Sequence, residues 1–179
     1  MITKEYLVNP STWFDLDGAI FTHHERYYLS IKSNEHVFIE LFNKEWSLKK
    51  LTISPSGEKH YEKKIISEQT ALDLKAKQDT RANNSLSYNE FRVPIKANGA
   101  DSRLLIYSAP LTHLMVLKLK FRNEDQMKDF RAPDFCLCDI TDDPYFSQLS
   151  LSSKDYINIQ KHINKHYKGK INRPDFFEQ

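Results

Sequence analysis

Alternation of apolar and polar residues is the feature that most constrains how this chain folds. The segment VLKLKF (116–121) places its two leucines and Phe121 on one side of an extended chain, and Lys118 and Lys120 on the other. Similar alternation along the chain predicts eight β-strands: Lys4–Val8, Tyr27–Ile31, Val37–Phe42, Glu45–Ile53, Lys59–Ile65, Glu90–Ile95, Arg103–Tyr107 and Met115–Phe121. The chain is therefore expected to be built mainly on a β-sheet.

Turn and capping residues place the connections between these strands. The run SPSGE between Ile53 and Lys59 predicts a tight turn that joins the fourth and fifth strands as a hairpin. Ser67 is expected to cap a helix over Glu68–Lys77. A short turn over Thr12–Asp17 is expected to place its Trp and Phe, residues 13 and 14, in the core.

Two further helices are expected in the second half of the chain. Asn123 caps the first, which has acidic residues in its first turn and ends before Pro133. The second begins near Ser152 or Ser153. Its apolar stripe contains Tyr156, Ile159, Ile163 and Tyr167.

Length and composition indicate one soluble globular domain over residues 1–168, including the C-terminal helix, with a tail over residues 169–179. The chain has 179 residues, 40% of them hydrophobic and 28% charged, and a net charge of only +2. This balance gives no reason to expect a nucleic acid or a membrane as a partner. Because no apolar run approaches twenty residues and no signal-peptide pattern is present, we expect a cytoplasmic protein.

Eight strands with mostly adjacent connections need their edges to be covered, and an antiparallel barrel does this economically. Several strands carry charge on one face and apolar residues on the other. In a closed barrel with helices packed outside, the polar face could point inward and form a polar tunnel. The predicted fold class is therefore α+β, an eight-stranded antiparallel barrel with flanking helices.

Several segments resemble the CYTH-domain family, the triphosphate tunnel metalloenzymes. The run APLTHLMVLKLKF (109–121) resembles the family strand G-x-L-x-G-L-x-x-A-E-x-E-F. The run FRAPDFCLCDITDDPYFSQLSLS (130–152) resembles its P-x-W-x-x-x-x-V-T-x-D-x-R-Y-x-N-x-x-L segment, and the hairpin before Ser67 and the N-terminal KEYLV also match. The resemblance implies an eight-stranded tunnel in which glutamates hold a divalent metal, and lysines and arginines hold a triphosphate.

The positions that hold metal and phosphate in that family carry different residues here. Its opening glutamates fall on Met1 and Thr3, and its late E-x-E pair falls on Lys118 and Lys120. Carried over position by position, the resemblance implies that these charged residues line the tunnel: Glu5, Glu40, Lys49, His60, Glu62, Lys64, Arg103, Lys118 and Lys120. Interior acids and bases are expected to pair with one another, because an unpaired ion in a dry interior costs several kcal/mol.

Three functions are compatible with such a tunnel. The leading hypothesis is a degenerate, non-catalytic CYTH-like protein that binds an anionic, phosphate-bearing ligand or a protein partner, without a metal or other cofactor, and that could form a homodimer. The alternative is a Mg²⁺- or Mn²⁺-dependent phosphohydrolase acting on inorganic triphosphate or nucleoside triphosphates, with Glu62 as its catalytic carboxylate. The third is an interaction scaffold whose tunnel is closed by salt bridges.

Other residue clusters offer weaker sites. His23 and Glu25 could converge on one face of a strand, and His162 and His166 have helical i,i+4 spacing that can hold zinc, although the surrounding lysines favour a solvated basic face. Asp142 and Asp143 precede Pro144 and predict a turn. The two cysteines, at positions 136 and 138, are expected to stay reduced, with one of them buried.

Overall fold

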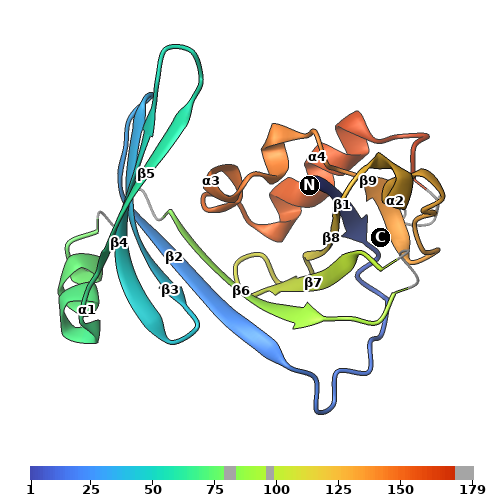
Figure 1. The fold of residues 1–179 in the computed structure, drawn as a ribbon, viewed down its shortest axis with the longest axis horizontal. Helices are drawn as coiled ribbons and strands as arrows, with labels where there is room; N and C mark the ends of the chain where they lie inside the picture. Colours follow the sequence, from blue (N-terminus) through green and yellow to red (C-terminus); the bar gives the residue numbers. More distant parts are fainter. Residues whose placement is uncertain (79–83, 96–98, 172–179) are drawn as a thin grey trace. The chain divides into compact units, whose positions relative to one another are not determined.

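A computed structural model describes residues 1–78, 84–95 and 99–171 (Figure 1). Within them lie nine strands: β1 (Ile2–Val8), β2 (Phe21–Ile31), β3 (Glu35–Phe42), β4 (Glu45–Ile53), β5 (Lys59–Ile65), β6 (Ser85–Arg92), β7 (Asp101–Tyr107), β8 (Met115–Phe121) and β9 (Cys136–Asp139). The helices are α1 (Glu68–Ala76), α2 (Glu124–Lys128), the 3₁₀ turn η2 (Pro144–Phe146), α3 (Gln148–Leu151) and α4 (Tyr156–His166).

The strands form one sheet in the order β5-β4-β3-β2-β6-β7-β8-β1-β9. Neighbouring strands run antiparallel in the pairs whose register is defined. Two parts of the sequence prediction change. The sheet has nine strands rather than eight, and no pairing among the described residues joins β5 to β9, so the sheet is open and the closed barrel is not confirmed. The ninth strand was missed because its alternation lasts only four residues.

The chain forms two compact units. Unit 1 contains Met1–Phe21 and Asn89–Gln179, and unit 2 contains Thr22–Tyr88. The single domain expected over residues 1–168 stays a prediction. Most of the expected tail over residues 169–179 lies outside the part of the chain that the structure describes.

The core of unit 1 lies on the apolar face of β8. Leu117, Leu119 and Phe121 are fully buried there, as the alternation of VLKLKF predicts. Phe14 packs against this cluster from the segment after β1. Trp13 is 82% exposed, so its expected place in the core was wrong. The segment around it has no regular secondary structure, and successive side chains of an extended segment point in opposite directions.

Unit 2 is built on the β4–β5 hairpin predicted from its turn sequence (Figure 1). Gly57 takes a φ of +85° in this turn, a backbone conformation that a side chain disfavours, and its N–H donates to the Ser54 carbonyl at 2.9 Å. Ser67 caps α1 as expected, because its side chain accepts a hydrogen bond from the Thr70 N–H at 3.1 Å. Helix α1 then packs against β3 and β4.

Capping also decides where the helices of unit 1 begin. Asn123 caps α2 as predicted. The last long helix begins at Tyr156 rather than near Ser152, because Asp155 and Asn158 form a capping box. Its expected apolar stripe is confirmed at Ile159 and Ile163, both fully buried. Of the helices described, none combines the length and apolar character needed to span a membrane.

Candidate functional site

Strand register brings the predicted charged residues of unit 1 together on one face of the sheet. Glu5 of β1 lies opposite Lys118 of β8, and Lys118 lies opposite Arg103 of β7. Lys120, two residues further along β8, lies opposite Thr3 and Asp101. Directly opposed residues of antiparallel strands project from the same face. We call this group, from β1, β7 and β8, the polar face of unit 1.

The ion pairs on this polar face are partly exposed and differ in length. Lys118 Nζ lies 3.4 Å from Glu5 Oε1, with the two side chains 32% and 28% exposed. Arg103 donates from Nε to Asp101 Oδ1 at 2.9 Å, and its Nη1 lies 3.4 Å from Glu90 Oε1. The hydrogen bond and charge of Arg103 lower the pKa of Asp101. Arg103 is therefore held in place by two carboxylates.

Among the described residues around the polar face of unit 1, the cations slightly outnumber the acids. Arg92 and Lys120 both lie in the electrostatic field of Asp101, in addition to Arg103. Together with Lys118 they make four cations, against the three carboxylates of Glu5, Glu90 and Asp101. Beside Lys118 and Glu5 the polar face borders a cavity of about 160 Å³.

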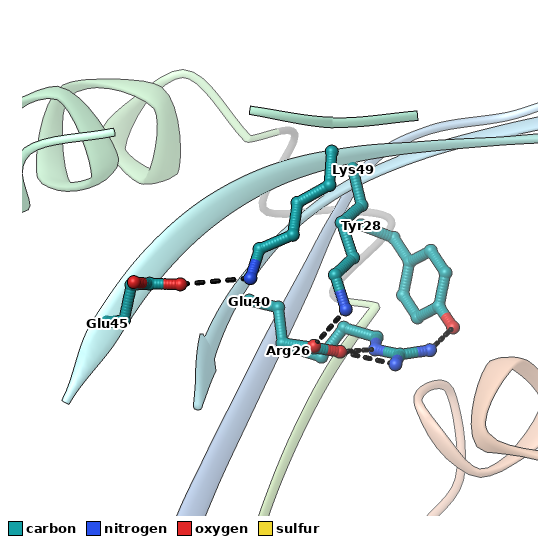
Figure 2. A network of polar contacts seen from close by, with 6 residues as sticks. Arg26, Tyr28, Glu40, Glu45 and Lys49 are labelled. Atoms are coloured by element: carbon teal, nitrogen blue, oxygen red, sulfur yellow. Dashed lines mark hydrogen bonds and ion pairs between the residues drawn. The ribbon is translucent and has the colours of Figure 1, made fainter. Parts of the chain in front are cut away.

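Unit 2 contains a tighter network around one buried carboxylate (Figure 2). Glu40 of β3 is 8% exposed. One of its oxygens, Oε2, accepts a hydrogen bond from Arg26 Nε at 3.0 Å and also contacts Arg26 Nη2. The other, Oε1, accepts from Lys49 Nζ at 2.6 Å. Both oxygens of Glu40 are therefore engaged by cations.

Aromatic side chains hold Arg26 in this network. Its guanidinium carbon lies 4.2 Å from the centre of the Phe38 ring, and its Nη1 donates to the Tyr28 hydroxyl at 3.3 Å. Burial by itself would raise the pKa of Glu40, but the charges and hydrogen bonds of Arg26 and Lys49 outweigh it, so the pKa is lowered. The network thus keeps Glu40 ionised.

Three predicted residues of β5 do not join this network. His60, Glu62 and Lys64 lie opposite Thr52, Lys50 and Leu48 of β4, all on the face of the hairpin that points away from Lys49.

Lys63 shares the face of Lys49 instead, and it pairs with Glu45 at 2.9 Å. All seven residues of β5 are exposed, so polar residues occur on both of its faces. Because β5 has no apolar face, the alternation of apolar and polar residues could not predict which of its side chains point toward Lys49.

Sequence reasoning missed Arg26. The expected strand began at Tyr27, whereas β2 begins at Phe21. Counting back in steps of two from the buried Tyr28 reaches Arg26 and then His24, and that alternation was a usable signal.

The strand Glu90–Ile95 was likewise placed too late, because β6 covers Ser85–Arg92. Pro94 lacks the N–H that a strand would need to continue pairing.

The carboxylates of the two units do not fit the divalent metal that the family resemblance implies. Glu40 has both oxygens occupied by cations, Glu5 lies beside Lys118, and Glu62 is exposed on the other face of its hairpin. Mg²⁺ and Mn²⁺ need several oxygen ligands converging on one point. Among the residues that the structure describes, no three His, Cys, Asp or Glu side chains are arranged to hold a metal ion.

The weaker clusters are structural contacts. His23 and Glu25 do converge, at 2.9 Å, as their alternation allows. His162 is not part of a solvated basic face. Its Nε2 lies 2.7 Å from Asp143 Oδ2, its ring stacks on Tyr145 at 3.7 Å, and its side chain is only 13% exposed.

Asp143 forms the predicted turn, in which its side chain accepts from the Tyr145 N–H at 3.0 Å. Cys136 and Cys138 are both buried, rather than one of them as expected, and they form no disulfide; burial raises the pKa of each to about 12. Neither is suited to react as a thiolate at neutral pH.

Solved structures share this fold. The crystal structure of the inorganic triphosphatase NE1496 matches with a TM-score of 0.70 and 15% identity, over 86% of this chain and 94% of that chain. A second structure, of the hypothetical protein NE1496, matches with a TM-score of 0.70 and 16% identity, over 86% and 97%. No family model and no curated protein matches the sequence. The CYTH-type fold indicated by the sequence motifs is therefore confirmed at the level of the fold.

Proposed function

We propose that this CYTH-type protein binds a phosphate-bearing anion on the polar face of unit 1, without a metal and without hydrolysing it. The observation that carries the proposal is the register that sets Arg103, Lys118 and Lys120 side by side. Phosphate oxygens are recognised by such groups of cations.

Spacing on the sheet suits one anionic group. Opposed residues on antiparallel strands lie about 5 Å apart, and residues two apart on one strand lie about 7 Å apart. The long side chains of Lys118 and Lys120 can therefore reach the same phosphate, with Arg103 opposite Lys118. Asp101 and Glu90 hold Arg103, which limits the entropy lost when a ligand binds.

Exchange of partners provides a route for binding. The Glu5–Lys118 pair is long and about one third exposed, and such pairs contribute only about 0–1 kcal/mol. A dianionic phosphate can take Lys118 from Glu5 at little cost, because Glu5 remains solvated.

Hydrolysis of triphosphate by a bound metal is the alternative function, and the name of the inorganic triphosphatase NE1496 makes it worth testing. It would need carboxylates that converge, whereas the late E-x-E positions of the family are Lys118 and Lys120 here. An interaction scaffold with a salt-bridged interior is favoured by one observation, the Glu40 network of unit 2. Homodimerisation, a cytoplasmic location and the lack of nucleic acid and membrane partners remain predictions.

Thermal unfolding with added anions tests the proposal. Inorganic triphosphate, phosphate or sulfate, each with EDTA present, should raise the melting temperature by at least about 5 °C at roughly 100 times the Kd. The double variant Lys118→Ala/Lys120→Ala should lose this rise. A matched double variant on an exposed strand of unit 2, Lys63→Ala/Lys64→Ala, should keep it. If no anion shifts the melting temperature, the proposal is wrong.

Phosphate release separates binding from hydrolysis. With triphosphate and Mg²⁺ or Mn²⁺, we expect no turnover above the buffer rate. Turnover that disappears in Glu62→Ala would establish the triphosphatase function instead.

A further inference from the structure

A cavity of about 160 Å³ lies beside the charged pair of the polar face. Its lining residues from β1, β7 and β8 include Glu5 and Lys118, and the rest of the lining comes from the segment around η2 and α3. All of its lining residues belong to unit 1. The cavity therefore begins where the proposed anion would sit.

Apolar side chains form about half of the wall of this cavity. Leu105 and Val116 line it from the sheet, and Ile140 and Phe146 line it from the segment after β9. Each of these four side chains is at most 6% exposed. An inorganic polyphosphate has no group that could use such walls, whereas a hydrocarbon group would gain from them.

The rest of the wall is polar and includes Glu5, Lys118 and Gln148. Lys118 and Glu5 lie there with 3.4 Å between Nζ and Oε1, compared with 2.6 Å between Lys49 and Glu40 in unit 2. Ser147, at the start of α3, is exposed and also lines the cavity, so it marks a side that faces solvent. A ligand with one anionic head and one apolar group matches this combination of polar and apolar lining residues.

Size limits the apolar group. A water molecule occupies about 30 Å³ in the liquid, so 160 Å³ corresponds to roughly five non-hydrogen atoms. Pockets for drug-sized ligands measure about 300–1,000 Å³. A nucleoside is too large for this cavity, and a group of four or five carbons fills it.

Resting on the function proposed above, we infer that the ligand is a small organic phosphate. Its phosphoryl group binds Lys118 and Lys120, and its organic group of about four or five carbons occupies the cavity between Val116 and Phe146. The cavity, and not the cations, selects this ligand over inorganic polyphosphates and nucleotides.

A homologous series of n-alkyl phosphates, from methyl to octyl, tests this inference by calorimetric titration with inorganic phosphate as the reference. Affinity should rise about fourfold per methylene group up to four or five carbons, and then level off or fall. If butyl phosphate binds no more tightly than inorganic phosphate, the inference is overturned while the anion site stands. If neither binds, the proposed function fails as well.

Two variants of the cavity walls sharpen the test. Val116→Phe fills the cavity, so it should remove the dependence of affinity on the chain length of the ligand. Phe146→Leu enlarges the cavity, so it should move the optimum up by about one carbon. Phe130→Leu, the same substitution at a residue packed against the core cluster on the apolar face of β8, should leave the optimum unchanged. The assignment is contradicted if Phe146→Leu does not move the optimal chain length, or if Phe130→Leu moves it equally. This test holds even if Val116→Phe fails to fold.

Discussion

The two units use charged residues on their sheet strands in different ways. In unit 2, Glu40 is buried, and its two oxygens are held by Arg26 and Lys49 at donor distances of 3.0 Å or less. In unit 1, Glu5 and Lys118 lie 3.4 Å apart, are about one third exposed and border a cavity. The cations of the unit 2 network are fully engaged by Glu40, whereas Lys118 of unit 1 can exchange Glu5 for another anion.

Burial explains this difference. A carboxylate removed from water must be fully paired, so the Glu40 network has no cation to offer a ligand without leaving an uncompensated charge. Opening a partly hydrated ion pair costs little free energy, because water and a ligand can replace the lost partner. The comparison supports a structural role for the network of unit 2 and agrees with the binding role that we propose for the polar face of unit 1.

Neutralising Glu40 should have the largest effect on stability. Glu40→Gln leaves Arg26 and Lys49 without their shared carboxylate, and breaking a buried ion pair in this way costs about 3 kcal/mol or more. Urea unfolding measures the loss. The matched exposed variant Glu62→Gln should change the free energy of unfolding by less than about 0.5 kcal/mol. Equal effects of the two variants would break the comparison.

Removing one cation from each unit should give smaller and unequal effects. Lys49→Met takes away a 2.6 Å charged hydrogen bond from a buried carboxylate and should cost about 2 kcal/mol. Lys118→Met leaves a hydrated Glu5 and should cost less than about 1 kcal/mol. The two variants are compared by urea unfolding at pH 7. If Lys118→Met costs as much as Lys49→Met, then the polar face of unit 1 is a structural network too.

The pH dependence of stability should show the smallest effect. The pKa of Glu40 is lowered in the folded state, so its ionised form adds stability that is present above the pKa of an unfolded glutamate, about 4.3, and is lost as the pH falls through the folded value. The stability deficit of Glu40→Gln relative to the wild type should therefore shrink between pH 5 and pH 3. Unfolding curves at several pH values measure it, and a deficit that grows with acidification would contradict the assignment.

Prediction from sequence succeeded where one face of a strand is buried. The leucines of VLKLKF are fully buried and its lysines lie on the other face, because exchanging the two faces would expose the core of unit 1. Capping by Ser67 and Asn123 and the turn at Gly57 depend on local backbone chemistry, and these were also correct.

Prediction failed where both faces of a strand are polar or where a strand is short. No burial distinguishes the two faces of β5, so Glu62 was placed on the side that Lys63 occupies. The short β9 was missed, although Cys138 pairs with Leu7 and the strand covers an edge of β1. The two edge strands of the sheet, β9 and β5, are protected in different ways. Strand β9 is short, and β5 carries three lysines.

The sequence by itself determined which residues form most of the strands and which face of β8 is apolar, and its resemblance to the CYTH family predicts lysines where that family has metal-binding glutamates. These follow from local alternation, turn chemistry and the identity of single residues. Only the tertiary structure decided that Arg26 and Lys49 close around Glu40, that Lys118 borders a cavity, and that the sheet stays open. Ion-pair partners and cavities depend on strand register and on packing between segments far apart in the chain. Local sequence patterns do not determine either of these.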